Sequence, residues 1–130
     1  MNTFTNARQH MPNLLRAFVL TVGITFVADQ AKSEEHGPDD TASFVPYCAD
    51  HFEACRTSVI AENNFNMLAV MGGKHGCTFP RTPGQSYHDD TITVTKAILV
   101  WLNDHQASLK PKTSDAIHQA KTALWPKECR

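Results

Sequence analysis

All four cysteines of this 130-residue chain lie downstream of one apolar stretch near the N-terminus. The stretch covers residues 17–28 and follows a segment with basic side chains, and the cysteines are Cys48, Cys55, Cys77 and Cys129. It has the length and flanks of a secretory signal peptide and is too short to span a bilayer. An even number of cysteines beyond an export signal is typical of disulfides formed in an oxidising compartment. The sequence therefore predicts a small exported domain whose fold is constrained by its disulfides.

Residues 1–31 are the predicted signal peptide, with Met11 as an alternative start because a short positive segment follows it. Neither Ala28 nor Ala31 completes a small-x-small cleavage site, so an uncleaved anchor stays an alternative. Residues 32–43 are acidic and rich in turn-forming residues, which predicts a flexible linker. Residues 44–130 then form one domain with a modest core.

Charge and hydropathy exclude two classes of partner for the mature chain. Beyond residue 31 the sequence holds 10 Lys and Arg against 12 Asp and Glu, a net charge of −2. Neither a basic run nor a basic excess is present, which argues against nucleic-acid binding. No second long apolar run follows the leader, which argues against a membrane role after signal cleavage.

Three helices are predicted from apolar residues at three- and four-residue intervals, over residues 52–71, 89–105 and about 111–124. In the first helix Met67, Leu68 and Met71 belong to the predicted apolar stripe, while neighbouring asparagines weaken its middle. This helix should end at the glycine pair that follows it, where a left-handed backbone is easily reached. The loop at residues 74–87 should be exposed and pinned only at its cysteine.

The last two helices differ in their apolar pattern. The helix at 89–105 is apolar nearly all round, which predicts a central position or a second face against another chain. In the third helix Pro111 suits the first turn, and Ser108 or Thr113 is the candidate cap. Its apolar stripe leaves Lys112, His118 and Lys121 on other faces. The predicted fold is therefore all-α, a small disulfide-stapled bundle of three to four helices.

Four cysteines allow three pairings. Cys48 and Cys55 are too far apart on one ideal helix, so they pair only if a turn separates them. Chain direction brings Cys77 and Cys129 to the same end of the bundle. The favoured pairing is Cys77–Cys129 with Cys48–Cys55, and the alternative is Cys48–Cys77 with Cys55–Cys129.

Catalytic and metal-binding patterns are weak in this sequence. Carboxylates adjoin imidazoles at residues 88–90 and 104–105, but adjacent helical residues point about 100° apart. No nucleophile elbow, zinc-protease motif, phosphate-binding loop or dinucleotide fingerprint is present. The spacings of His51 with Cys55 and of His75 with Cys77 can hold zinc, yet export favours oxidised thiols. We therefore expect no enzyme activity, no metal and no cofactor, with Trp101 and Trp125 in the core.

Three segments of the C-terminal half resemble the Rap1a/Tai family of immunity proteins, namely Cys77-Thr78-Phe79-Pro80, the helix end from Ile98 to His105, and Ala123-Leu124-Trp125-Pro126 followed by Cys129. Members show a cysteine and a proline ahead of the penultimate helix, a Leu-x-x-His ending, and an aromatic-Pro-Cys signature after the last helix. Leu102 and His105 match that ending. The match spans about residues 48–129.

The resemblance implies an all-helical, disulfide-bonded periplasmic protein that is often a homodimer. Family members bind a toxic effector delivered by type VI secretion and block its active site, and a cell-wall amidase-type toxin is one such effector. The sequence departs from the family at residues 55–58, where the usual Gly and Tyr are missing, so fold and compartment transfer better than partner choice.

Two other classes of function fit the same features. One is a periplasmic acid-stress or chaperone-like binder, since its histidines would respond to acidification. The other is a structural subunit of an envelope complex, which the nearly all-round apolar middle helix would suit.

Overall fold

The computed structural model describes residues 35–129, and the predicted signal peptide at residues 1–31 lies outside them. The described chain forms four α-helices and two short 3₁₀ helices: α1 (Thr41–Cys48), α2 (Phe52–Met71), α3 (Tyr87–Asp104), η2 (Gln106–Ser108), α4 (Thr113–Leu124) and η3 (Pro126–Glu128). No strand occurs within this range, although two isolated β-bridges do. The all-α prediction is confirmed.

The helix ends follow local backbone chemistry. α2 has the predicted bounds, and it ends where Gly73 adopts a φ of 75°, a left-handed conformation that favours glycine. α3 begins two residues before the predicted start, because the Ser86 hydroxyl accepts a hydrogen bond from the Asp89 N–H at 3.1 Å. α4 begins at Thr113, and neither predicted cap is its N-cap, a position that Lys112 occupies without a side-chain hydrogen bond.

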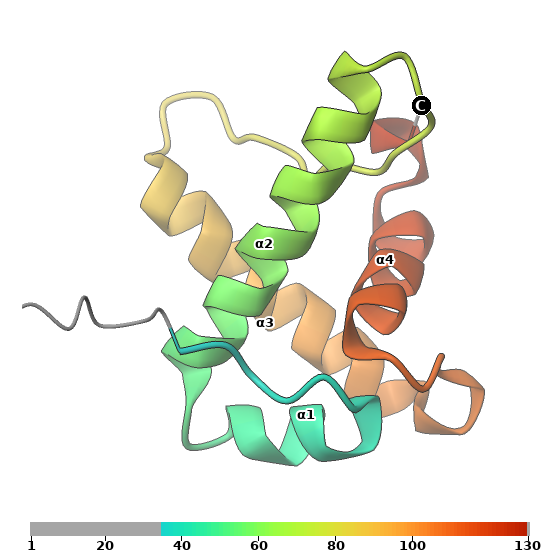
Figure 1. Cartoon of the computed structure of the whole chain (residues 1–130). Helices are drawn as coiled ribbons and strands as arrows, with labels where there is room; N and C mark the ends of the chain where they lie inside the picture. The colour runs from blue at the N-terminus through green and yellow to red at the C-terminus, as the bar shows by residue number, and fades with distance from the viewer. Residues whose placement is uncertain (1–34, 130) are drawn as a thin grey trace, which may run out of the picture. The chain divides into compact units, whose positions relative to one another are not determined.

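The core lies where α2, α3 and α4 pack against one another, with α3 crossing behind α2 in Figure 1. Its fully buried apolar side chains come from all four helices and include Phe44, Val59, Ile98, Leu102 and Ile117. α3 packs against the other three α-helices but keeps an exposed side that includes Val100, so it is not buried all round. Both tryptophans are half-buried and pack against this core.

The packed domain begins earlier than the sequence predicts. The backbone N–H of Gly37 donates to the Ser58 hydroxyl at 2.9 Å, and the Thr113 hydroxyl donates to the carbonyl of Pro38 at 2.7 Å. Asp40 then caps α1, which starts at Thr41. Residues 37–43, expected to belong to a flexible linker, thus lie against α2 and α4, because their backbone groups find partners there.

Two disulfides join the ends of the bundle. Cys48 pairs with Cys55 across the short turn between α1 and α2, with a Cα–Cα distance of 5.7 Å. Cys77 pairs with Cys129, with a Cα–Cα distance of 4.0 Å, and so joins the loop before α3 to the segment after α4. This is the pairing that chain direction favours.

Candidate binding surface

The acid–histidine neighbours in the sequence make separate contacts in the structure. His105 stacks on Trp101 with ring centroids 4.1 Å apart, and its Nδ1 lies 2.7 Å from the Trp101 carbonyl. Asp90 is buried and accepts a hydrogen bond from Nε of Arg81 at 2.7 Å, rather than facing His88. His105 thus lies at the C-terminal end of α3, and Asp90 joins the first turn of α3 to Arg81 of the preceding loop.

Neither of the two histidine–cysteine pairs whose spacing could hold zinc has a free thiol. Cys55 and Cys77 are both in disulfides, and His51 stacks on Tyr47 with centroids 4.0 Å apart. Among residues 35–129, no group of three or more His, Cys, Asp or Glu side chains is placed to hold a metal ion.

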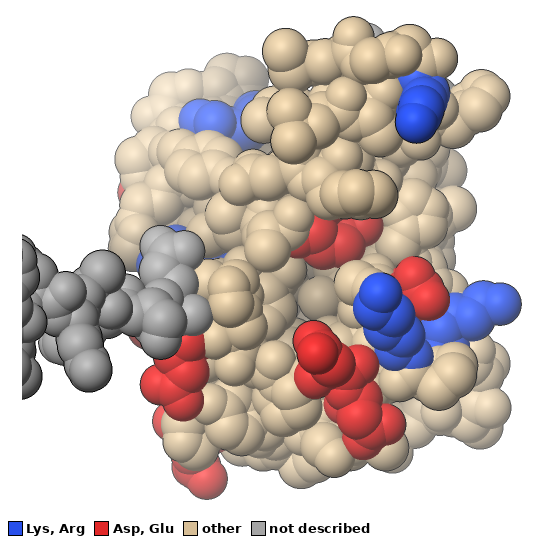
Figure 2. Space-filling model, in the orientation of Figure 1, with Lys and Arg blue, Asp and Glu red and all other residues tan. Residues whose placement is uncertain are grey.

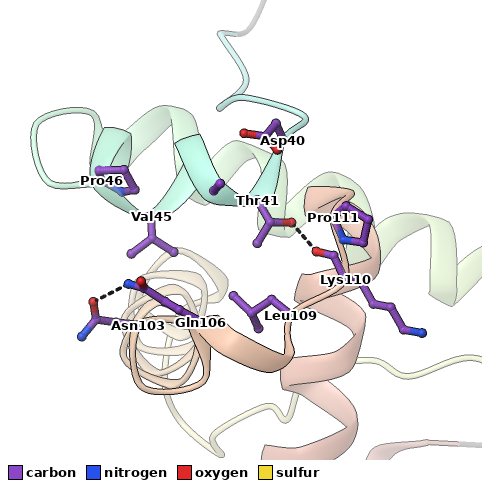
Figure 3. Close-up of a pocket in the computed structure, with 10 residues that line it drawn as sticks. Asp40, Thr41, Val45, Pro46, Asn103, Gln106, Leu109, Lys110 and Pro111 are labelled. Carbon is purple, nitrogen blue, oxygen red and sulfur yellow. Dashed lines mark hydrogen bonds between the residues drawn. The ribbon is translucent and has the colours of Figure 1, made fainter.

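A cavity of about 540 Å³ lies between α1 and the segment that links α3 to α4 (Figure 3). Two hydrogen bonds join polar groups of its lining. The Thr41 hydroxyl donates to the carbonyl of Lys110 at 2.7 Å, and the Gln106 amide donates to Oδ1 of Asn103 at 3.2 Å. These paired groups are less available to a ligand.

The C-terminal half of α2 has the opposite of the usual amphipathic arrangement. Its inward face carries Glu62, Asn63 and Asn66, which are only 6–7% exposed. Its outward face carries the apolar side chains of Phe65 (74% exposed), Met67 (45%), Leu68 (65%) and Met71 (78%), which together we call the α2 ridge. Met67, Leu68 and Met71, which belong to the apolar stripe predicted from sequence, therefore do not pack inward.

The two buried asparagines hold the loop that follows α2. Oδ1 of Asn63 accepts the backbone N–H of Phe79 at 2.8 Å, and Oδ1 of Asn66 accepts the backbone N–H of Cys77 at 2.9 Å. Phe79 itself is buried in the core. The prediction that this loop is pinned only at its cysteine is wrong, since the asparagines satisfy backbone donors that would otherwise be buried without partners.

A buried ion pair joins the same face of α2 to α4. The ammonium of Lys121, a fully buried residue, lies 2.7 Å from Oε2 of Glu62 and 3.3 Å from Oδ1 of Asn63. Nδ1 of the half-exposed His118 lies 3.3 Å from the other Glu62 oxygen. Burial lowers the pKa of Lys121 against the opposing effect of the Glu62 carboxylate. The prediction that Lys121 lies away from the packed face is therefore wrong.

These contacts explain why the apolar ridge can stay outside. The inward face of α2 is occupied by polar groups that the loop and α4 require, and every buried side-chain nitrogen or oxygen in the described range has a partner. The spacing of Glu62, Asn63 and Asn66, a polar stripe at three- and four-residue intervals, is the sequence signal that could have revealed this orientation. The ridge is thus the candidate binding surface.

Comparisons with known proteins return no match to a family model, to a curated protein or to a solved structure. In the described part of the chain, no helix combines the length and the apolar character that crossing a bilayer requires.

Proposed function

We propose that this chain is a periplasmic immunity-type protein that binds a toxic protein effector and neutralises it by obstruction. The observation that carries this proposal is the Cys77–Cys129 disulfide, because it joins two of the segments in which the chain resembles the Rap1a/Tai family. Two disulfides suit an oxidising compartment such as the periplasm.

The physical properties of the domain suit an inhibitor that works by binding. The loop between α2 and α3 is held at two places. The Cys77–Cys129 disulfide and the two α2 asparagines hold its first part, and the Arg81–Asp90 ion pair holds it closer to α3. A surface that is already ordered loses less conformational entropy when a partner binds. Obstruction also requires no catalytic group on the inhibitor.

Co-expression tests the proposal directly. The full chain is produced in a bacterium that exports the toxin encoded by the neighbouring gene to its periplasm, and growth and complex formation are measured. We expect rescue by the full chain and no rescue by a variant without residues 1–31, which keeps the protein from its proposed compartment. An exported, folded protein that neither rescues growth nor forms a complex would contradict the proposal.

The buried ion pair favours a second candidate function, an acid-responsive chaperone. The Lys121–Glu62 pair ties α4 to α2, so conditions that break this pair would loosen the packing of the two helices. The α2 ridge would then belong to a larger apolar surface able to hold unfolded clients. Suppression of client aggregation at pH 3 but not at pH 7, together with no binding to the toxin, would support this function over the first.

A further inference from the structure

We infer that the α2 ridge is the surface that enters the partner, and that the partner presents an apolar groove with carboxylates on its rim. This inference rests on the proposed function, since it names the contact surface and the partner chemistry of the same binding event. Its evidence is the shape, the size and the charge of the described residues around the ridge.

The shape of the ridge is convex. The last turns of α2 project from the bundle, and residues 71–75, which include the helix end and the two glycines after it, are all exposed (Figure 1). Phe65, Leu68 and Met71 follow one another at three-residue intervals, so they share one side of the projecting helix. A convex apolar helix is complementary to a groove rather than to a flat surface.

The size of the ridge argues against a second copy of this chain as its binding partner. Its four side chains expose on the order of 500 Å², given that a large ring buries about 150–250 Å². Two ridges laid against each other would therefore bury less than the roughly 800 Å² per partner of a standard interface. A groove that wraps the helix also covers its flanks and the exposed glycine turn, so it reaches a larger area.

The charges around the ridge indicate which charges the rim of the partner's groove carries. From Ala54 to His88 the single acidic residue is Glu62, which is buried, whereas Lys74 is exposed and Arg81 is paired with Asp90. Lys74 follows the ridge directly, three residues after Met71. Figure 2 shows the projecting end of α2 in tan with blue at its edge, and most of the red side chains lower on this face. Carboxylates on the partner would therefore meet a cation and no exposed anion of this segment.

The test uses matched polar substitutions on the full chain. The double variant Leu68→Gln/Met71→Gln changes the ridge, and Val100→Gln changes another exposed apolar side chain, 63% exposed on α3. We expect the ridge variant to bind the neighbouring-gene toxin at least about tenfold more weakly, as loss of central apolar anchors does, and the control to bind within about twofold of the unmodified chain. Binding is measured by calorimetry, and urea unfolding verifies that both variants fold.

A charge reversal tests the rim. We expect Lys74→Glu to slow association and to weaken its dependence on salt, and Lys96→Glu on the exposed side of α3 to change neither. Equal effects of the two reversals would overturn the acidic rim.

The outcomes separate the inference from the proposed function. If the unmodified chain binds and rescues growth and the folded ridge variant does so equally well, the inference is wrong and the proposed function stands. If the unmodified chain itself neither binds nor rescues, both fail. If light scattering shows a dimer that the ridge variant alone dissociates, the occupant is a second copy and the inference is overturned.

Discussion

At the scale of the residue, the stability of the fold depends on the ion pair between Lys121 and Glu62. Its ammonium is fully buried and paired with Glu62 at 2.7 Å. We expect Lys121→Met to lower the free energy of unfolding by about 3–5 kcal/mol, since it leaves the Glu62 carboxylate buried without its main counter-ion. Urea unfolding followed by circular dichroism measures this loss.

The double variant Glu62→Gln/Lys121→Met is the control for that prediction. It removes both charges and keeps an amide that can still bond to Asn66, so we expect it to recover much of the lost stability. Losses that simply add in the double variant would show that the two side chains act independently.

The same lysine predicts a dependence of stability on pH. Burial lowers the pKa of Lys121 in the folded state below the ordinary value of 10.5. Between these two pKa values the unfolded chain binds more protons, so the free energy of unfolding rises with pH through that window and is flat below it. Urea midpoints measured as the pH is raised toward 10.5 should increase for the unmodified chain relative to Lys121→Met. A constant difference between the two would contradict the lowered pKa.

At the scale of the element, the second half of α2 buries polar side chains and exposes apolar ones. We expect Asn63→Leu to destabilise by about 1–3 kcal/mol although it adds an apolar side chain, because the backbone N–H of Phe79 then loses its buried acceptor. Leu68→Gln on the same helix should change stability by less than about 0.5 kcal/mol, since Leu68 is exposed. Thermal and urea unfolding of both variants provide the measurement, and a stabilising Asn63→Leu would contradict the polar inner face.

The sequence predicts where the helices begin and end far better than which side of each helix faces the core. Apolar spacing and the glycine pair fixed the bounds of α2, and Cys55 and Val59 of its first half are in the core as expected. In its second half, however, spacing alone cannot say which side faces inward. That choice depends on the backbone donors of Cys77 and Phe79 and on Lys121, which are distant in the sequence. Apolar spacing misses the α2 ridge for the same reason, and the polar spacing of Glu62, Asn63 and Asn66 is the sequence feature that points to it.

At the scale of the whole molecule, the two disulfides contribute unequally. Cys77 and Cys129 are separated by 52 positions and Cys48 and Cys55 by 7. The chain-entropy relation gives about 4 kcal/mol for the longer loop and about 2.5 kcal/mol for the shorter one. We expect Cys77→Ser/Cys129→Ser to lose more stability in urea than Cys48→Ser/Cys55→Ser. The reverse order would mean that the longer loop stays ordered in the unfolded chain.

The Cys77–Cys129 bond also makes residues 77–129 a closed covalent ring that contains α3 and α4. A trypsin-like endoprotease that hydrolyses the peptide bond after exposed Arg81 opens this ring without releasing a fragment. The nicked molecule would migrate as one species on a non-reducing gel and would separate into two pieces only after reduction. A cut after Arg81 thus leaves every helix tethered to the others, whereas a cut after exposed Lys74, which precedes the ring, would separate α1 and α2 from α3 and α4.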